Sequence, residues 1–440
     1  MDTPMNLIGK HVAILGVGRS GRAAAQLALR EGARVSAWDL AGEDAFGEMP
    51  AGVEIHPNAS EAHGHGVVSD LLVVSPGIDS YGTYVAAFAR GAGEVIGEIE
   101  LASRFYQGKI IGITGTNGKT TTTELVARIL NHVGLGGTPC GNYGVPFAEV
   151  VLQAHVPSVV SLELSSFQLE TMRTLHPVVA IWLNFAPDHM DRYASVEVYR
   201  AAKLRIFENL DAQDTAVVRA GEDLPVVAAR VVTFSTTEAQ ATWFSDGHVI
   251  SHDGETWLDM DRDTSLRGLH NVENAMAALA ACQTLGISAA SMREALHGYA
   301  PPPHRCELIR TLDGVEYLND SKATNLHALE SALRSQTRPV VLIAGGKDKG
   351  LDYGSVVPLL REKALATVTF GQIARPLAAL FRDAVPSESV TTLADAVAVA
   401  RGLAPRGTTI LLSPGTSSFD QFSGYEQRGN AFRDLVHQLR

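Results

Sequence analysis

The sequence predicts an α/β protein with three domains. Apolar, strand-like runs alternate with helical segments over much of its 440 residues, which is typical of parallel sheets. Two glycine-rich turns, at residues 16–21 and 115–118, each follow such a run and precede a helical pattern. We therefore expect an N-terminal Rossmann-like domain (residues 1–99), a central P-loop ATPase-like domain with a small β portion (residues 100–304), and a C-terminal Rossmann-like domain with a doubly wound sheet (residues 305–440).

The charge and the cysteines narrow the possible partners and compartments. A net charge of −12 argues against a broad nucleic-acid-binding face, so local basic groups and helix N-termini must bind any anionic ligand. Cys140, Cys282 and Cys306 are far apart and odd in number, which fits a reducing compartment. The sequence shows no signal-peptide pattern and no run of about 18 apolar residues. We therefore expect a cytoplasmic protein.

The first domain opens with a nucleotide-binding pattern. A strand at residues 11–15 leads into Gly16-Val17-Gly18-Arg19-Ser20-Gly21, a helix follows, and a second strand ends in Asp39. Taken alone, this G-x-G-x-x-G turn with a later acid predicts an NAD enzyme. A nucleotide diphosphate of another kind satisfies the same pattern equally. A further strand, residues 71–74, ends at Ser75-Pro76-Gly77, at the edge where open α/β sheets bind ligands.

The central domain begins with a P-loop pattern, Gly115-Thr116-Asn117-Gly118-Lys119-Thr120-Thr121. Small residues let backbone N–H groups close around phosphate oxygens, while Lys119 can reach the outer phosphates and the Thr120 hydroxyl can ligate Mg²⁺. Ile113 stands where the standard pattern has glycine. The structural alternative is a glycine-rich turn with a surface lysine.

Three later segments could complete a metal site. The strand at residues 157–163 ends in Glu163, and an acid at a strand tip beside a P-loop is the usual Mg²⁺ ligand, although a surface acid is the simpler alternative. A loop then brings Asp188, His189 and Asp191 together, whereas a loop histidine is often only solvated. Lys203, on a helical segment at residues 198–207, is by default a solvated residue.

The second half of the chain predicts short alternating strands between residues 214 and 260 and an alanine-rich helix at residues 270–286. Pro301-Pro302-Pro303-His304-Arg305 is typical of a linker. Beyond it, strands alternate with helices, which predicts a parallel, doubly wound sheet. Three of these strands end in loops rich in Ser, Thr, Lys and Gly, so we expect a second binding edge there.

Residues 115–120, together with the departure at Ile113, resemble the ATP loop of the Mur ligase family, whose relatives include folylpolyglutamate synthase. Five longer blocks resemble the family member that adds D-glutamate: residues 162–170, 188–193, 199–206, 319–325 and 420–429. The sequence lacks the Asp-Asn-Pro-Arg motif expected of the diaminopimelate-adding relative. The resemblance covers all three predicted domains.

The resemblance implies a reaction, its cofactors and its partners. ATP would phosphorylate the alanine carboxylate of UDP-N-acetylmuramoyl-L-alanine, and the amine of D-glutamate would then displace phosphate from the acyl phosphate, in cytoplasmic peptidoglycan precursor synthesis. The implied cofactors are ATP, two Mg²⁺ ions and CO₂, bound as a carbamate on Lys203. The partners would be these small molecules, with no nucleic acid and no membrane, and the chain would act as a monomer.

The resemblance also implies roles for individual residues. The catalytic residues would be Lys119, His189 and Lys203, and the metal ligands Thr120, Glu163, His189 and carbamylated Lys203. ATP would contact Gly115, Thr116, Asn117, Gly118, Lys119, Thr120, Thr121, Asn274, Arg305 and Asp320. The UDP substrate would contact Arg19, Ser20, Asp39, Ser75, Pro76, Gly77, Asn142 and His189. D-glutamate would contact Lys322, Thr324, Lys349, Ser418 and Tyr425.

Two positions depart from relatives, and other functions stay open. Asp39-Leu40-Ala41 stands where one relative has Asp-Thr-Arg, and Tyr425 stands where relatives can carry Phe.

Three alternative functions are compared with the ligase. An NAD(P)-dependent oxidoreductase would leave the P-loop and the third domain without a role. A P-loop switch protein would hydrolyse nucleotide without an amino acid. A folylpolyglutamate-type ligase accepts a pterin, for which the first-domain fingerprint has no use.

Overall fold

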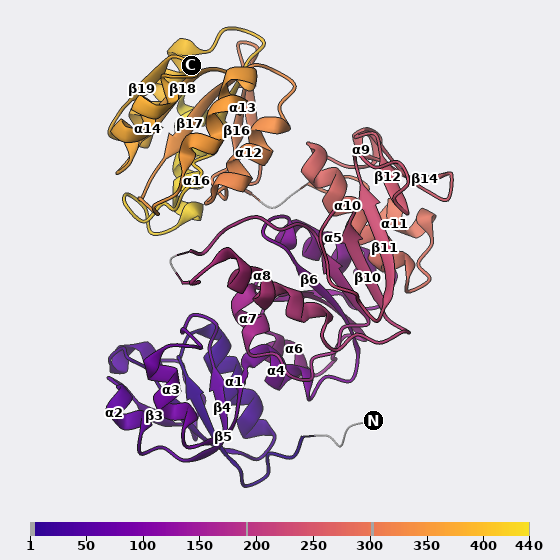
Figure 1. Cartoon of the computed structure of the whole chain (residues 1–440), viewed down its shortest axis with the longest axis vertical. Helices are drawn as coiled ribbons and strands as arrows, with labels where there is room; N and C mark the ends of the chain where they lie inside the picture. Colours follow the sequence, from indigo (N-terminus) through magenta and orange to yellow (C-terminus); the bar gives the residue numbers. More distant parts are fainter. Residues whose placement is uncertain (1–4, 191, 301–302, 440) are drawn as a thin grey trace. The chain divides into compact units, whose positions relative to one another are not determined.

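A computed structural model describes residues 5–190, 192–300 and 303–439. The chain divides into two compact units, one formed by residues 1–245, 251–258 and 273–296 and the other by the remaining segments. The described residues form three sheets (Figure 1). None of the described helices is long and apolar enough to cross a membrane.

The N-terminal sheet has five parallel strands in the order β3-β2-β1-β4-β5. Its strands and helices are β1 (His11–Leu15), α1 (Arg19–Arg30), β2 (Arg34–Trp38), β3 (Glu54–His56), α2 (Glu61–Gly64), β4 (Ser69–Val74), α3 (Thr83–Ala89), β5 (Ala92–Gly97) and α4 (Glu98–Ser103).

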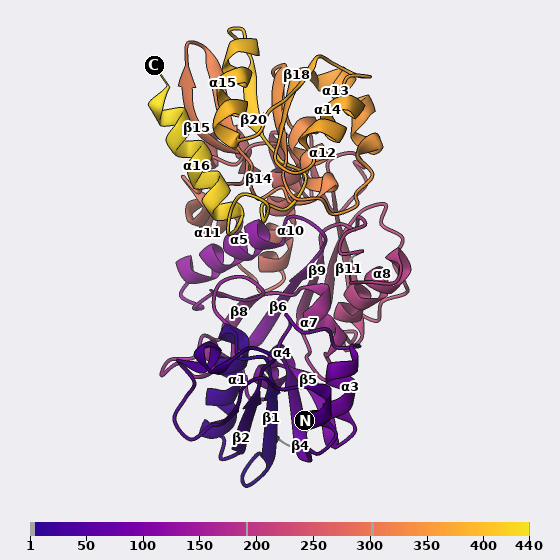
Figure 2. The same cartoon turned by 90° about the vertical axis from the view of Figure 1, so that its left-hand side faces the viewer.

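Side chains of β1 alternate between two cores. Val12 and Ile14 belong to the cluster that contains Leu27 of α1, whereas Ala13 and Leu15 pack in the cluster that contains Phe88 of α3. Figure 2 shows these two helices on opposite sides of the strands. The strand order reverses between β1 and β4, so the loops after these two strands meet at the switch point where such sheets bind ligands.

The central sheet has nine strands in the order β14-β13-β12-β11-β10-β9-β6-β8-β7. The strands are β6 (Lys109–Thr114), β7 (Thr138–Gly141), β8 (Val159–Glu163), β9 (Val179–Trp182), β10 (Thr215–Arg219), β11 (Arg230–Ser235), β12 (Trp243–Ser245), β13 (Val249–His252) and β14 (Glu255–Asp259). The helices along this part of the chain are α5 (Lys119–His132), α6 (Phe147–Val151), α7 (Ser166–Glu170), α8 (Val196–Leu204), α9 (Met260–Asp263), α10 (Leu269–Gln283) and α11 (Ala289–Leu296).

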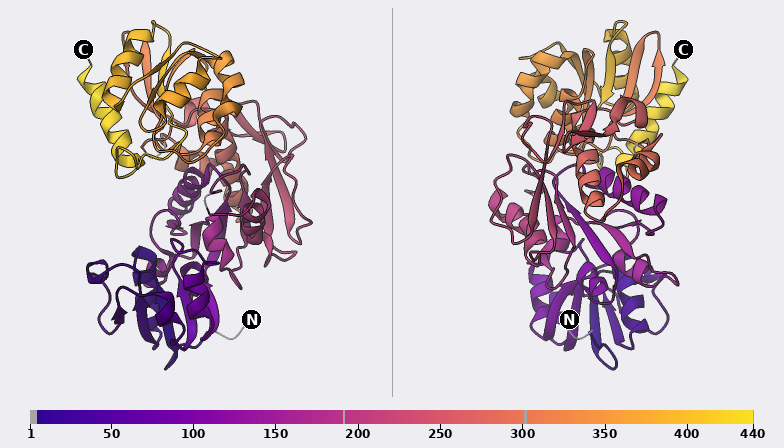
Figure 3. Two further views of the ribbon diagram at one scale, coloured as in Figure 1. Left: turned by 60° about the vertical axis from the view of Figure 1, so that its left-hand side comes forward. Right: turned by 90° about the vertical axis from the view of Figure 1, so that its right-hand side faces the viewer.

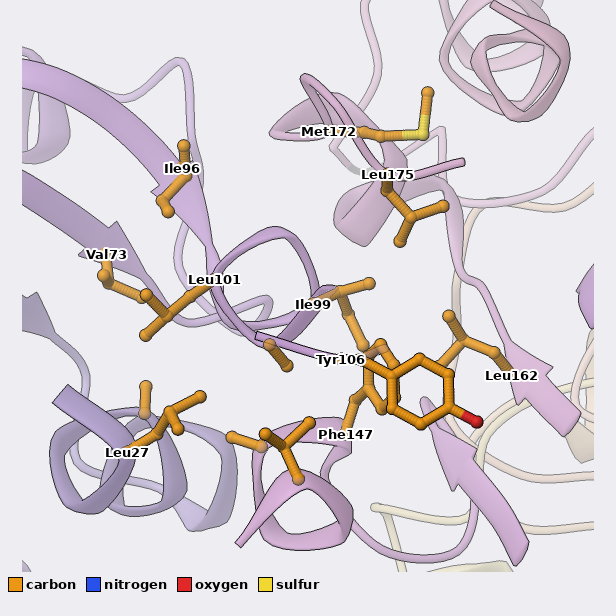
Figure 4. Packing of buried hydrophobic residues seen from close by; sticks show 14 of the residues in the cluster. Leu27, Val73, Ile96, Ile99, Leu101, Tyr106, Phe147, Leu162, Met172 and Leu175 are labelled. Carbon is orange, nitrogen blue, oxygen red and sulfur yellow. The ribbon is translucent and has the colours of Figure 1, made fainter. Parts of the chain in front are cut away.

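The parallel strands β8, β6 and β9 lie side by side, so the loops that follow them share one edge of the sheet. The strands expected between residues 214 and 260 are present, and they extend this sheet rather than forming a separate one. A hydrophobic cluster of this unit includes Ile99 and Leu101 of α4 together with Tyr106 and Phe147 (Figure 4). The predicted domain boundary at residue 99 falls within α4.

The C-terminal sheet has six strands in the order β15-β16-β20-β17-β18-β19, with helices on both faces (Figure 3). Leu342 and Leu411 pack in the cluster that contains Leu329, and Ile343 and Leu412 pack in the cluster that contains Phe432. The elements are β15 (Glu307–Leu312), β16 (Val315–Asn319), α12 (Leu326–Arg334), β17 (Val340–Gly345), α13 (Val357–Lys363), β18 (Ala364–Phe370), α14 (Ala374–Phe381), β19 (Ser387–Ser389), α15 (Leu393–Leu403), β20 (Thr409–Leu412) and α16 (Tyr425–Gln438).

One edge of the C-terminal sheet departs from the predicted parallel arrangement. Strand β15 pairs with β16 in the antiparallel direction. The two strands are joined by Asp313 and Gly314, whose positive φ angles of 52° and 80° suit a tight hairpin turn. The predicted linker lies partly outside the described residues, because Pro301 and Pro302 are not among them.

Candidate functional site

The P-loop connects β6 to α5, and hydrogen bonds to Asn184 hold its shape. Gly118 has a φ of 85°, which favours glycine, and it immediately precedes the helix. Asn184, just beyond β9, accepts a hydrogen bond from the backbone N–H of Asn117 (3.0 Å) and donates one to the Asn117 carbonyl (3.1 Å). The Thr116 N–H donates to the Asn184 carbonyl at 3.0 Å. The loop therefore has a fixed shape before any phosphate binds.

Two lysines converge on one backbone oxygen of this loop. The Nζ atoms of Lys119 and Lys203 each donate a hydrogen bond to the Gly115 carbonyl at 2.9 Å. Lys203 is only 2% exposed, so the default expectation for a lysine on a helix, a solvated side chain, does not hold at this position. Burial, together with the neighbouring Lys119 ammonium, holds the pKa of Lys203 well below its usual range, although Asp188 and Glu163 act in the opposite direction. The site therefore favours a neutral amine at Lys203.

Glu163 ends β8 at the same edge of the sheet as the P-loop, and it is buried. Its Oε1 atom accepts a hydrogen bond from Nδ2 of Asn142 at 2.7 Å. Its Oε2 atom is buried without a hydrogen-bond partner among the described residues. An unpartnered carboxylate oxygen in this place fits a hard cation such as Mg²⁺. The Thr120 hydroxyl, in the first turn of α5, is the other predicted ligand on this edge.

The loop after β9 places His189 in a constrained conformation. His189 has a φ of 58°, which is uncommon for a residue other than glycine, and its N–H donates to Asp188 Oδ1 at 2.8 Å. Its ring packs edge-on against Phe167, with the ring centroids 5.0 Å apart. Asp188 is buried, whereas Asp191 lies outside the described residues.

Asn274 of α10 is brought to the P-loop although it lies more than 150 residues further along the chain. A Cβ atom built on Gly118 would lie 2.2 Å from Asn274 Oδ1, so the side chain of Asn274 packs directly on this glycine. The other two predicted ATP contacts, Arg305 and Asp320, belong to the C-terminal unit.

The glycines of the β1–α1 turn have different surroundings. The Gly16 carbonyl accepts a hydrogen bond from Ser75 Oγ at 2.9 Å, which ties together the two loops at the switch point. A Cβ on Gly21 would lie 1.8 Å from the Gly16 oxygen, whereas a Cβ on Gly18 would meet nothing within 4 Å. Gly21 therefore permits close packing, and Gly18 leaves the backbone accessible to a ligand.

Three of the other first-domain residues of the predicted site, Asp39, Arg19 and Pro76, already make contacts within the protein. Asp39 accepts hydrogen bonds from the N–H groups of Val17 (2.9 Å) and Ala41 (2.8 Å). Arg19 forms an ion pair with Glu149 at 3.1 Å. Ser20 lies in the first turn of α1, the Pro76 carbonyl accepts a hydrogen bond from Arg192 at 3.2 Å, and Gly77 is exposed.

The predicted D-glutamate residues lie on neighbouring loops of the C-terminal sheet. Lys322 and Thr324 follow β16, Lys349 follows β17, Ser418 follows β20, and Tyr425 begins α16. The Lys322 ammonium lies 3.9 Å from the centre of the Tyr425 ring, and Lys349 Nζ donates to the Thr324 carbonyl at 3.5 Å. The sheet order β16-β20-β17 places these loops at one edge.

Asp320, a predicted ATP contact, is a buried carboxyl group next to this edge. Its Oδ2 accepts a hydrogen bond from Ser413 (2.9 Å), and its Oδ1 accepts one from the N–H of Cys306 (3.2 Å). Burial raises the pKa of Asp320 to about 7, and these hydrogen bonds only partly oppose the shift.

A group of three candidate metal ligands in the described part of the chain, His176, Asp211 and Asp214, is not the predicted site. His176 precedes β9 and Asp214 precedes β10, so the group lies at the edge of the sheet opposite the P-loop. Asp214 already accepts hydrogen bonds from His176 and from the Asp211 N–H, which accounts for the arrangement without a metal.

Two family models match this chain: the Mur ligase middle domain over residues 113–282 and the Mur ligase glutamate ligase domain over residues 304–415. Three similar relatives are each named UDP-N-acetylmuramoylalanine–D-glutamate ligase. The Myxococcus xanthus protein is 41% identical over 98% of this chain and 99% of its own length. The Acidobacterium capsulatum protein is 39% identical over 98% and 97%, and the Geobacter metallireducens protein 39% identical over 99% of both. The chain belongs to the Mur ligase family.

Solved structures support the fold assignment of this Mur ligase. The UDP-N-acetylmuramate-alanine ligase MurC of Thermotoga maritima has a TM-score of 0.61 at 18% identity, covering 97% of this chain and 99% of its own. The pseudomurein peptide ligase type C of Methanothermus fervidus also has a TM-score of 0.61 at 18% identity, covering 98% and 100%. The predicted three-domain α/β fold is thus confirmed.

Sequence reasoning missed two residues that shape the sites of this Mur ligase. Asn184 fixes the P-loop, and its only sequence signal is its place directly after a strand on the binding edge. Arg428 is completely buried beneath the loops of the C-terminal sheet; it lies within the block at residues 420–429 that resembles the family, but no role was assigned to it, because arginine on a helix is ordinarily solvated.

Proposed function

We propose that this Mur ligase joins D-glutamate to UDP-N-acetylmuramoyl-L-alanine at the expense of ATP, in cytoplasmic peptidoglycan precursor synthesis. The alanine carboxylate attacks the γ-phosphorus of ATP, ADP leaves, and an acyl phosphate forms. The D-glutamate nitrogen then attacks the acyl carbon, the carbon–oxygen bond to phosphate breaks, and the amine gives up a proton. The chain would act as a monomer, with UDP bound within residues 1–99, ATP within 100–304 and D-glutamate within 305–440.

The observation that carries the proposal is the pair of lysines on the Gly115 carbonyl beside Glu163. A P-loop requires Lys119 alone, so a second, fully buried lysine calls for its own explanation. A neutral Lys203 amine is a nucleophile that can react with CO₂: nitrogen bonds to carbon, one proton leaves, and an anionic carbamate results. The low pKa of Lys203 supports this reaction.

The residues present fit a divalent cation. Glu163 offers a buried, unpartnered oxygen, Thr120 offers a hydroxyl group, and a carbamate on Lys203 together with His189 would offer further donors. Bound Mg²⁺ would neutralise charge on the phosphates and on the developing acyl phosphate. The protein itself contributes the shaped P-loop and Lys119, which can swing from the loop carbonyls to the phosphates.

The loops at the other sheet edges suit the remaining substrates. Gly18 leaves the N-terminus of α1 accessible, and a helix N-terminus favours the diphosphate of UDP. Lys322 and Lys349 offer ammonium groups and Thr324 and Ser418 offer hydroxyl groups, which suit the two carboxylates of D-glutamate. Tyr425 adds a ring beside the Lys322 ammonium and a hydroxyl group that a Phe at this position would lack.

The proposed UDP binding differs from the NAD binding that the turn at residues 16–21 and Asp39 would predict when taken alone. In dinucleotide-binding proteins the acid after the second strand binds a ribose hydroxyl. Here both oxygens of Asp39 accept hydrogen bonds from the N–H groups of Val17 and Ala41, a structural role that needs no ribose. Saturable NAD binding that competes with UDP would favour the dinucleotide function instead.

Phosphate release with ATP, Mg²⁺ and UDP-N-acetylmuramoyl-L-alanine tests the proposal. The acceptors to compare are D-glutamate, L-glutamate, D-alanine and meso-diaminopimelate. Release that depends on D-glutamate is expected. Release without an acceptor, or equal release with all four, would contradict the proposal and favour a nucleotide hydrolase.

A further inference from the structure

Arg428 of α16 is a buried cation. Its side chain is completely buried, and the carboxylates of Asp420 and Asp320 act on its charge in the opposite direction to burial. Loss of hydration lowers the pKa of Arg428 to about 10, which leaves it charged at neutral pH. A buried charge is costly unless hydrogen bonds compensate it, so the partners of this group show what it is there to hold.

Those partners are oxygens of two loops. The guanidinium donates to the Ser321 carbonyl (2.8 Å) and the Ser321 hydroxyl (3.0 Å), and also to the Thr416 carbonyl (3.1 Å from Nη2). The Ser321 hydroxyl in turn donates to the Tyr425 carbonyl at 2.8 Å. Arg428 thereby links the loop after β16, the loop after β20 and the first turn of α16.

A third loop packs on the same group. A Cβ built on Gly346, after β17, would lie 3.2 Å from Arg428 Nη1 and 2.4 Å from the Ser417 carbonyl. The N–H of Lys347 donates to that Ser417 carbonyl at 3.0 Å. The guanidinium therefore lies where all three loops meet, and each of these loops carries predicted D-glutamate residues.

We infer that Arg428 is a positioning residue for D-glutamate: it fixes the spacing of the loops that carry Lys322, Lys349 and Ser418. This inference rests on the proposed function. Arginine suits the task because its planar group donates several hydrogen bonds in fixed directions at once, which lysine cannot do.

The test compares Arg428→Lys and Arg428→Met with the wild type in D-glutamate-dependent phosphate release. The KM for D-glutamate should rise roughly tenfold or more in Arg428→Met, as expected when charge-assisted hydrogen bonds are lost, while the KM values for ATP and the nucleotide sugar stay within about twofold. Arg428→Lys, which keeps the charge but not the geometry, should show a smaller rise.

Arg433→Met is the matched control, because Arg433 lies on the same helix but pairs with Glu307 at 2.7 Å on the partly exposed side. It should leave the KM for D-glutamate unchanged. Equal changes in all three KM values, an effect on kcat alone, no effect, or loss of the fold in both Arg428 variants would overturn the inference. A wild-type protein without D-glutamate-dependent release would overturn the proposed function as well.

Discussion

Lys203 is the residue on which the proposed chemistry depends most. Its burial beside Lys119 makes a protonated side chain costly. The usual role of a P-loop lysine, binding the outer phosphates, already belongs to Lys119. A carbamate would convert this neutral amine into an anionic oxygen donor near Glu163 and Asp188. The helical pattern alone gave only the default of a solvated Lys203, because helical spacing does not reveal which face of a helix is covered; the different role came from the family resemblance.

Replacing Lys203 by Arg should lower kcat at least about 100-fold, because arginine keeps the positive charge and cannot react with CO₂. The exposed Lys109 provides the control, and Lys109→Arg should retain full activity. Initial rates of phosphate release with all three substrates measure both effects. A Lys203→Arg protein with more than half of the wild-type rate would contradict the carbamate role.

Glu98 leads to a second prediction for a single residue. It is buried, its Oε1 accepts the Ala148 N–H at 2.6 Å, and its Oε2 has no partner among the described residues. Burial raises its pKa from 4.5 to about 7. Between these two values the unfolded chain releases a proton that the folded chain keeps, so the contribution of Glu98 to stability falls as the pH rises.

The Glu98→Gln variant has no ionisable group at this position, so its stability does not fall with rising pH in this way. The unfolding free energy of Glu98→Gln relative to wild type should therefore rise by on the order of 3 kcal/mol between pH 4.5 and pH 7 and level off above. Urea unfolding of both proteins at several pH values measures the difference. A difference that does not change with pH would show that the Glu98 pKa is close to 4.5 in the folded protein.

At the scale of elements, two glycines of the β1–α1 turn have different tasks. Gly21 allows close packing, whereas Gly18 leaves room for a ligand. Gly21→Ala places a Cβ against the Gly16 carbonyl and should lower the melting temperature by several degrees. A Cβ added at Gly18 would meet no atom within 4 Å, and the Gly18 backbone has a φ of −63°, which alanine adopts readily. Gly18→Ala should therefore leave the melting temperature unchanged. Because Gly18 faces the proposed diphosphate, Gly18→Ala should nevertheless raise the KM for the nucleotide sugar.

Thermal unfolding and steady-state kinetics of the two alanine variants, measured side by side, check this division. Equal effects on stability would mean that the turn is held differently from the arrangement described. An unchanged KM for the nucleotide sugar in Gly18→Ala would contradict the proposal that the diphosphate binds at the N-terminus of α1.

The elements show what a sequence can and cannot predict. Strands followed by glycine-rich turns, such as β1 and β6, were predicted because a short apolar run and a turn are both local signals. The hairpin at Asp313-Gly314 carried a local signal that was passed over. Contacts such as Asn274 on Gly118 or Arg428 under three loops could not be predicted from local pattern, because they depend on which distant segments the fold brings together.

At the scale of the whole molecule, the three sheets share one design. Each carries its candidate residues on loops that follow parallel strands: residues 16–21 and 75–77 in the first, 115–120 and Glu163 in the second, and 320–324, 346–349 and 416–418 in the third. The strand order reverses next to these loops, which is where open α/β sheets bind ligands. Under the proposed function, each of these three edges would bind one of the three substrates.

Transfer of ¹⁸O from substrate to phosphate tests the central claim most directly. UDP-N-acetylmuramoyl-L-alanine labelled with ¹⁸O in both oxygens of the alanine carboxylate is incubated with ATP, Mg²⁺ and D-glutamate, and the released phosphate is analysed by mass spectrometry. If the carboxylate attacks ATP and the amine then displaces phosphate, each phosphate carries one ¹⁸O atom. Unlabelled phosphate would mean that water attacked ATP, and it would contradict the acyl-phosphate mechanism.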